Sequence, residues 1–183
     1  MASSSTSSSS PRGENESYVF DVFINHRGPD VKKTLATDLY HRLCAHDLLV
    51  FLDQRELREG ENITPQIESA IRTASVHIAI FSPNYASSKW CLDELVLMAD
   101  TNFKSTIIPV FYGVKPAELR WTQGGKGVYA QALRELQEKK DVDGRPRYDS
   151  NTLEKWRKAL SDVAEIKGFD GETYNRCEHH PSM

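Results

Sequence analysis

Residues 76–95 read VHIAIFSPNYASSKWCLDEL and predict a buried strand, a polar loop and the start of a helix. The first six residues are apolar apart from His77, which is typical of a strand buried on both faces. The helix carries an apolar stripe at the spacing i, i+3, i+4 and i+7, formed by Leu92, Leu95, Val96 and Ala99. Trp90 and Glu94 are four residues apart, so they are neighbours on a different face. A large ring beside a carboxylate near a helix start makes this pair the first candidate for chemistry.

A plainer interpretation of the same residues stays open at this point. Asp93 and Glu94 would then be ordinary acids of an early helical turn, favoured there by the helix dipole. Trp90 would be a ring that covers the core, and His77 is more simply a satisfied core histidine than a ligand. The surroundings of the stretch in the fold distinguish the two interpretations.

The rest of the chain predicts strands and helices in alternation. Strands are expected at residues 18–24, 48–52 and 106–112, in addition to 76–81. A helix with apolar residues every four positions follows the first strand and contains Val31, Leu35, Leu39 and Leu43. Thr64 with Pro65 is typical of an N-cap and a first helical position. This βαβαβαβ order predicts an α/β protein with a flavodoxin-like parallel sheet of four to five strands and helices on both faces.

Weaker signals follow residue 112. They indicate a helical turn at 114–120, a helix at 128–139, an exposed loop at 141–149 and at most a short strand after 168. One more amphipathic helix is marked by Leu153, Trp156, Leu160 and Val163.

The length of 183 residues suits one domain with tails. We expect a disordered Ser-rich leader at 1–16, the domain at 17–170 and a polar C-terminal tail at 171–183. The leader has no apolar segment typical of a secretory signal, and no apolar run reaches the length of a membrane span. We therefore expect no membrane partner and a cytoplasmic location.

Composition excludes several functions. The formal net charge is −3 and no long basic run occurs, so nucleic acid is not an expected partner. The three cysteines, Cys44, Cys91 and Cys177, are odd in number and irregularly spaced, which fits a reducing compartment. Since no Cys/His cluster has zinc spacing, we expect no metal site.

The predicted topology brings two loops together. In a flavodoxin-like sheet, ligands bind at the carboxyl ends of the first and third strands, where the strand order reverses. The loops there are 25–29, with Arg27 and Gly28, and 82–89, which leads to Trp90 and Glu94. Arginine suits a phosphate, glycine a close backbone approach and tryptophan a stacked base. The carboxylate could hold ribose hydroxyls or stabilise an oxocarbenium-like state, so the set suits a nucleotide.

Other functions of this architecture lack their residues. A phosphoacceptor receiver needs acids after the first strand and an Asp at the end of the third, where this chain has Asn25-His26 and Phe81-Ser82. No flavin phosphate loop, P-loop or G-x-G-x-x-G is present. No Ser/His/Asp order stands out for acyl transfer.

Four stretches resemble the plant branch of the Toll/interleukin-1 receptor (TIR) domain family: YVFDVFINHRG at 18–28, GENI at 60–63, NYASSKWCLDEL at 84–95 and PVFYGVKP at 109–116. The resemblance extends from about residue 18 to about residue 169, and the third stretch is the most specific. Several features depart from the family pattern. His26 replaces an aromatic residue, and Glu59 precedes Gly60 where arginine is usual, with Arg58 one place earlier. Thr37-Asp38 takes the place of a Ser-His pair that plant members use in self-association, and the family's last helix has no expected counterpart in 171–183.

The resemblance implies a NAD⁺ nucleosidase or ADP-ribosyl cyclase of plant immune and cell-death signalling, made as a TIR-only protein. Glu94 would be the catalytic acid, with Trp90 beside the substrate and Arg27, Gly28 and His26 in contact with the nucleotide. The loop at 53–62, with Arg58, Glu59 and Gly60, would be a mobile lid. NAD⁺ or NADP⁺ would be the substrate and no cofactor is implied. The implied partners are further copies of the chain and other TIR proteins, in the cytoplasm and also the nucleus.

Two further functions stay open. The main alternative is a non-catalytic adaptor that binds other TIR domains through this fold. The other is cleavage or cyclisation on a nucleic-acid polymer, against which the missing basic stripe counts.

Overall fold

A parallel sheet forms the centre of the computed structural model, which describes residues 19–52, 63–100, 105–120, 125 and 127–171. The strand order is β2-β1-β3-β4-β5, with every neighbouring pair parallel. The strands are β1 (Val22–His26), β2 (Val50–Leu52), β3 (Val76–Phe81), β4 (Thr106–Phe111) and β5 (Phe169–Asp170). This order confirms the predicted flavodoxin-like α/β fold.

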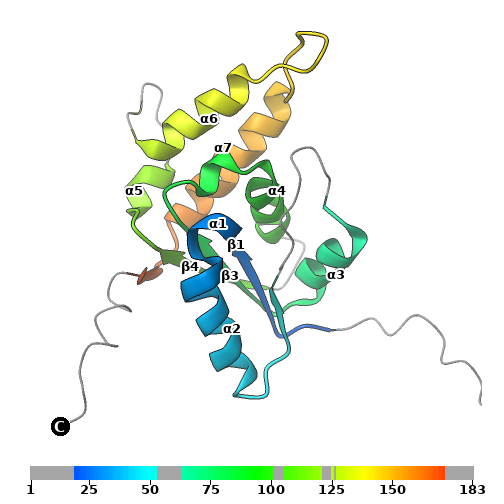
Figure 1. Cartoon of the computed structure of the whole chain (residues 1–183), viewed down its shortest axis with the longest axis vertical. Coiled ribbons are helices and arrows are strands. Elements are labelled where there is room, and N and C mark those ends of the chain that lie inside the picture. Colours follow the sequence, from blue (N-terminus) through cyan, green and yellow to red (C-terminus); the bar gives the residue numbers. More distant parts are fainter. Residues whose placement is uncertain (1–18, 53–62, 101–104, 121–124, 126, 172–183) are drawn as a thin grey trace, which may run out of the picture.

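Helices cover both faces of the sheet (Figure 1). The first group is α1 (Gly28–Val31), the π-helical turn η1 (Lys32–Ala36) and α2 (Thr37–Cys44). The second group is α3 (Pro65–Thr73), the 3-10 turn η2 (Tyr85–Ser87), α4 (Lys89–Met98), α5 (Pro116–Leu119), α6 (Val128–Glu138) and α7 (Ser150–Ala164). Figure 1 shows α1 and α2 on one side of the strands and α3 and α4 on the other.

Alternation along the strands divides the core into two clusters, because successive side chains of a strand point to opposite faces. On β1, Phe23 packs with the helices of the second group, whereas Val22 and Ile24 pack with the first group. On β3, Phe81 joins Phe23 in the larger cluster. That cluster takes in buried side chains of α3, α4, α6 and α7, so the α4 helix is anchored on both of its flanks.

Three helices begin where side chains cap their free backbone N–H groups. Thr64 Oγ1 accepts from Ile67 N at 3.4 Å, with Pro65 as the first helical residue, which confirms the predicted start of α3. Ser88 Oγ accepts from Cys91 N at 3.4 Å at the start of α4. Asp149 Oδ1 accepts from Thr152 N at 2.6 Å at the start of α7.

The first strand and the first helix differ from their predicted bounds. β1 begins at Val22 rather than at residue 18, since Asp21 turns aside and its carboxylate accepts from Leu49 N at 2.8 Å. The same contact delays β2 to Val50. β1 then continues to His26, and α1 begins at Gly28, where a turn-rich loop was predicted.

The predicted first helix is interrupted at Thr34, whose φ of −130° and ψ of −107° are not helical. Its apolar residues consequently divide, with Val31 and Leu35 buried and Leu39 and Leu43 only half-buried. The other helices agree with their predictions to within a few residues.

β5 is short and reaches the sheet beside a glycine. A Cβ on Gly168 would lie 2.4 Å from Pro109 O and 2.6 Å from a ring carbon of Phe111. Only glycine therefore lets the chain approach β4 this closely. The predicted leader at 1–16 and residues 172–183 of the predicted tail lie outside the described residues.

His77 is fully buried on β3, and its Nε2 donates to Ile71 O at 2.8 Å, which confirms a core histidine. Burial lowers the pKa of His77 below its ordinary value of 6.5, and the hydrogen bond to Ile71 only partly opposes this. The unfolded chain therefore binds more protons than the folded one as the pH falls below about 6.5.

We predict that the stability contributed by neutral His77 is fully present above about pH 6.5 and is lost as the pH falls toward the lowered pKa. The free energy of unfolding, measured by urea at about pH 7.5 and about pH 5.5, should fall less in His77→Gln than in the wild type. Equal losses in both proteins would contradict this.

Candidate active site

The candidate site lies at the carboxyl ends of β1 and β3, which are adjacent in the sheet. Three segments meet there: residues 25–30 at the end of β1 and the start of α1, residues 82–88 after β3, and the first turns of α4. Hydrogen bonds join them directly, as the prediction from topology expected. The place is the reversal of strand order, because β1 lies between β2 and β3.

Glu94 lies inside this junction and not on a solvated face. It is 3% exposed, although it sits in a helix with three half-buried neighbours, Asp93, Val96 and Leu97. Asn25 Nδ2 donates to Glu94 Oε2 at 2.7 Å. Since a carboxylate in a protein interior is costly unless it is hydrogen-bonded, this contact accounts for how Glu94 can be accommodated there. The interpretation of Glu94 as a surface acid is therefore wrong.

Asn25 is held in turn by Tyr85, which belongs to the turn η2. The Tyr85 hydroxyl donates to Asn25 Oδ1 and lies 3.0 Å from Cys91 O. Asn25 Nδ2 also lies 3.4 Å from Cys91 O. Asn25 and Tyr85 are both fully buried, so three elements (β1, η2 and α4) share one enclosed polar cluster.

A second cluster forms around Asp30, at the mouth of the same junction. Asp30 Oδ1 accepts from Arg27 Nη1 at 2.7 Å, and Asp30 Oδ2 accepts from Ser82 Oγ at 2.6 Å. Asn84 N donates to Asp30 Oδ2 at 3.3 Å. Because Asp30 receives donors from both loops, it ties the segment after β1 to the segment after β3.

The electrostatics of the site leave the thiol and phenol groups neutral. Burial, and next the nearby Glu94 carboxylate, raise the pKa of the Cys91 thiol to about 12. Burial is also the main reason that the pKa of Tyr85 lies well above its ordinary value. A thiolate is the reactive form of cysteine, so Cys91 is not a nucleophile at neutral pH. Glu94 is the group suited to acid–base or charge-stabilising chemistry.

The predicted substrate-binding residues lie at the junction in different settings. Arg27 is half-buried and paired with Asp30, and Gly28 begins α1 beside it. His26 is 9% exposed, and its carbonyl accepts the Cys91 thiol at 3.5 Å. Trp90 is half-buried and packs on the larger core cluster, as the core-covering interpretation expected.

The predicted lid residues Arg58, Glu59 and Gly60 lie outside the described residues. Their roles stay predictions from the resemblance.

Asp93, the acid next to Glu94, has a structural setting instead. Its carboxylate accepts from Trp156 Nε1 at 2.8 Å and from Lys89 Nζ at 2.6 Å. These contacts join α4 to α7 and stabilise the first turn of α4. Adjacent acids of one helix therefore have separate surroundings.

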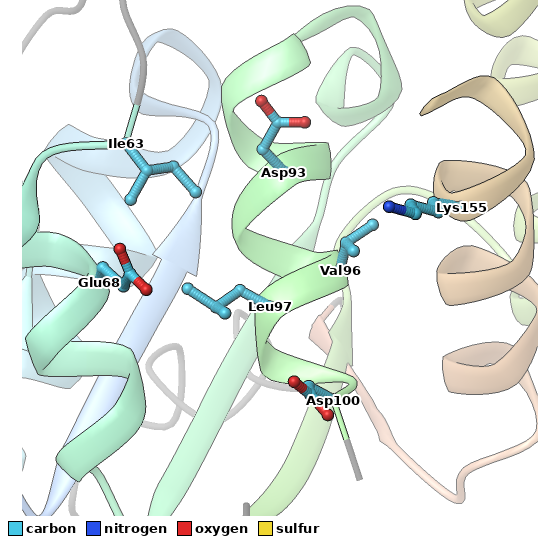
Figure 2. Close-up of a pocket in the computed structure, with 7 residues that line it drawn as sticks. All are labelled: Ile63, Glu68, Asp93, Val96, Leu97, Asp100 and Lys155. Carbon is cyan, nitrogen blue, oxygen red and sulfur yellow. The ribbon is translucent and has the colours of Figure 1, made fainter. Parts of the chain in front are cut away.

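A groove between α3, α4 and α7, of about 490 Å³, lies apart from the candidate site (Figure 2). Its lining residues are Ile63, Glu68, Asp93, Val96, Leu97, Asp100 and Lys155. Glu94 is not among them, so this groove and the Glu94 junction are different places on α4.

Asn25, Tyr85 and Asp30 were not singled out from the sequence. Asn25 had one usable signal, because it is a polar residue directly after the apolar run 22–24. Tyr85 and Asp30 had none, since a tyrosine and an acid in loops are common.

Within the described ranges, no three His, Cys, Asp or Glu side chains gather as metal ligands would. Within the same ranges, no helix is both long and apolar enough to cross a bilayer.

Comparison with known families gives one match over most of the chain. The model of the TIR domain family matches residues 19–180.

Curated relatives are plant proteins. TMV resistance protein N of Nicotiana glutinosa is 37% identical over 172 residues, which is 92% of this chain and 13% of that protein. The probable 2′ cyclic ADP-D-ribose synthase BdTIR of Brachypodium distachyon is 46% identical over 100 residues, 55% of this chain and 44% of that protein. The chain thus spans less than half the length of either relative.

A solved structure also matches. The TIR domains of the activated Roq1 resistosome, which directly recognises the pathogen effector XopQ, superpose with a TM-score of 0.70 at 36% identity. The match covers 85% of this chain and 90% of that one.

The Asp30 cluster leads to a stability prediction. The Asp30 side chain, which pairs with Arg27, is only 11% exposed. Asp30→Asn removes this ion pair and should lower the free energy of unfolding by about 2 kcal/mol. Glu68→Gln is the matched control, since the Glu68–Arg72 pair is 46% and 44% exposed and should contribute less than about 0.5 kcal/mol. Urea unfolding of both variants measures the difference, and equal losses would contradict the assigned role of Asp30.

Proposed function

The chain belongs to the TIR domain family, and from this membership we propose that it cleaves the bond between nicotinamide and ribose in NAD⁺. The products are nicotinamide with ADP-ribose or with cyclic ADP-ribose isomers. The observation that carries the proposal is the buried Glu94 carboxylate, which Asn25 orients at the carboxyl ends of β1 and β3.

The relatives support this reaction. The name of BdTIR describes a probable synthase of 2′ cyclic ADP-D-ribose, and the region of similarity covers 55% of the present chain. TMV resistance protein N is by its name a resistance protein, which supports a place in plant immune signalling. Because the chain spans only part of both relatives, activity and pathway belong to the proposal.

Glu94 would act on the ribose. As the C1′–N bond breaks, nicotinamide leaves with the bonding electron pair and positive charge develops on the sugar, as in glycosidases. A fixed carboxylate next to the ribose stabilises that charge and can hold a ribose hydroxyl. Attack by water at C1′, with loss of its proton, gives ADP-ribose, whereas attack by a hydroxyl of the same molecule gives a cyclic isomer.

The neighbouring residues would bind the nucleotide. Arg27 follows β1 and Gly28 is the first residue of α1, where a cation and a backbone N–H suit a phosphate. Trp90 is one helical turn before Glu94 and would lie beside the base or the ribose. The same proposal gives His26 a contact with the nucleotide and makes the loop with Arg58, Glu59 and Gly60 a lid. It also allows NADP⁺ as a substrate in place of NAD⁺.

Assembly is a further part of the proposal. The similar TIR domains of the Roq1 resistosome come from an activated assembly, which supports contacts between TIR domains of this chain and its own copies. Other TIR proteins are candidate partners, and a cytoplasmic and nuclear location is proposed with them.

The proposal predicts nicotinamide release that depends on Glu94. Wild-type protein at high concentration should release nicotinamide from NAD⁺, and Glu94→Gln should lower the rate by at least about 100-fold, because the isosteric amide carries no charge. Release is measured by liquid chromatography, together with the sugar nucleotide formed.

Asp93→Asn is the matched control, because it neutralises the adjacent acid outside the enclosed cluster while an oxygen still faces Trp156. It should keep most of the activity. Activity retained in Glu94→Gln would show that the site is wrong, and a wild type without release under these conditions would favour the non-catalytic adaptor.

Self-association leads to a separate prediction. If contacts between copies complete the site, specific activity should rise with protein concentration over the range in which gel filtration detects assembly. A specific activity that is independent of concentration would contradict this part of the proposal and leave the reaction itself unaffected.

A further inference from the structure

We propose that Asn25 and Tyr85 are positioning residues that hold Glu94 ionised and in one orientation for its reaction. This inference rests on the proposed function for its role in catalysis, but the state of Glu94 that it describes can be measured without substrate. Neither residue needs to touch the substrate, since both act through the carboxylate.

The surrounding acceptors determine how the Asn25 amide is turned. Cys91 O lies 3.4 Å from Nδ2 and, as a carbonyl oxygen, can only accept hydrogen bonds, whatever the charge of Glu94. Glu94 Oε2 lies 2.7 Å from the same nitrogen. Reversing the amide would place Oδ1 against both of these oxygens. The two hydrogens of Nδ2 therefore serve Glu94 and Cys91, and Oδ1 faces the Tyr85 hydroxyl.

Tyr85 completes this arrangement as a donor. Its single hydroxyl proton goes to Asn25 Oδ1, because this amide oxygen can only accept a hydrogen bond and needs the proton of the hydroxyl that it faces. Burial, followed by the charges of neighbouring groups, raises the pKa of Tyr85 well above its ordinary value, so the hydroxyl keeps its proton at neutral pH. Tyr85 therefore donates a hydrogen bond to Asn25, and Asn25 donates one to Glu94.

The three side chains come from separate elements that the core holds in place. Asn25 belongs to β1, Tyr85 to η2 and Glu94 to α4. Within the larger cluster the Tyr85 ring stacks with Tyr129 and lies tilted against Phe81. A rotation of the Glu94 carboxylate would break its bond to Asn25, which itself cannot turn without losing Tyr85. The orientation of the carboxylate is thus set by packing and not by its own rotamer preference.

The hydrogen bond also bears on the charge of Glu94. Burial in an apolar region disfavours a carboxylate, whereas an N–H donor favours it. The donor from Asn25 acts against the burial and keeps Glu94 in the form that can stabilise positive charge on the ribose. An apolar residue of similar shape at position 25 would remove this support alone, because Tyr85 and Cys91 O lie 3.0 Å apart and can pair directly.

The test measures the titration of Glu94 by carbon-13 NMR of labelled glutamate, with the signal assigned by its absence in Glu94→Gln. In Asn25→Leu we expect the midpoint to rise by at least about one pH unit relative to the wild type. In Tyr85→Phe, which keeps the ring, we expect a smaller rise. The acidic limb of the pH profile for nicotinamide release should move in the same direction by the same amount.

Tyr129→Phe is the matched control. Tyr129 is also a buried phenol, and its hydroxyl donates to a backbone oxygen, Ser82 O, at 2.8 Å, without contact to Asn25 or Glu94. Its loss of stability should resemble that of Tyr85→Phe, but the Glu94 midpoint should stay unchanged.

The outcomes separate this inference from the proposed function. A folded Asn25→Leu or Tyr85→Phe protein with an unchanged Glu94 midpoint overturns the inference, as does a shift of equal size in Tyr129→Phe. If the midpoint moves as expected while the wild type releases no nicotinamide, the positioning of Glu94 stands and the proposed reaction fails. Should Asn25→Leu not fold, Tyr85→Phe against Tyr129→Phe decides the matter alone.

Discussion

The hydrogen bond from Asn25 to Glu94 connects the sheet with α4 at the point on which the proposed chemistry depends. It joins residues 69 positions apart at 2.7 Å, and both partners are enclosed by the core. A carboxylate enclosed in this way persists only when donors compensate for the water it has lost. The strand order, the cap of α4 and the turn η2 all serve to bring that donor and that acceptor together.

The Asp30 cluster has a related task at the mouth of the site. A single carboxylate receives Arg27 from its own loop and Ser82 from the loop after β3. The two loops that frame the site are thus bound to each other as well as to the sheet. Asp30 holds Arg27 in place, and in the proposed nucleotide site this would reduce the entropy that binding must overcome. Such a rigid frame around the Glu94 carboxylate suits the proposed reaction, in which charge develops at a fixed position.

Asp93 and Glu94 are neighbours in α4 but have different surroundings, and only Glu94 lies in the enclosed cluster. Asp93 faces α7 and holds Trp156, whereas Glu94 turns toward β1. The α3–α4–α7 groove (Figure 2) is lined by Asp93 and not by Glu94. The Cys91 thiol, whose pKa burial raises to about 12, stays neutral and adds no negative charge beside Glu94.

By itself the sequence determined the order of strands and helices, the cap at Thr64, and the candidate pair Trp90 and Glu94. These features follow from local periodicity and from residue types at fixed spacing, which a linear sequence carries in full. It did not determine that β1 would start at Val22, that Thr34 would interrupt the first helix, or that Asn25, Tyr85 and Asp30 would serve the site. The start of β1 and the roles of Asn25, Tyr85 and Asp30 depend on contacts across 28 to 69 positions, such as Asp21 with Leu49 and Asn25 with Glu94. Only the folded sheet brings these partners within bonding distance, and no local pattern encodes which distant donor a buried acceptor will meet.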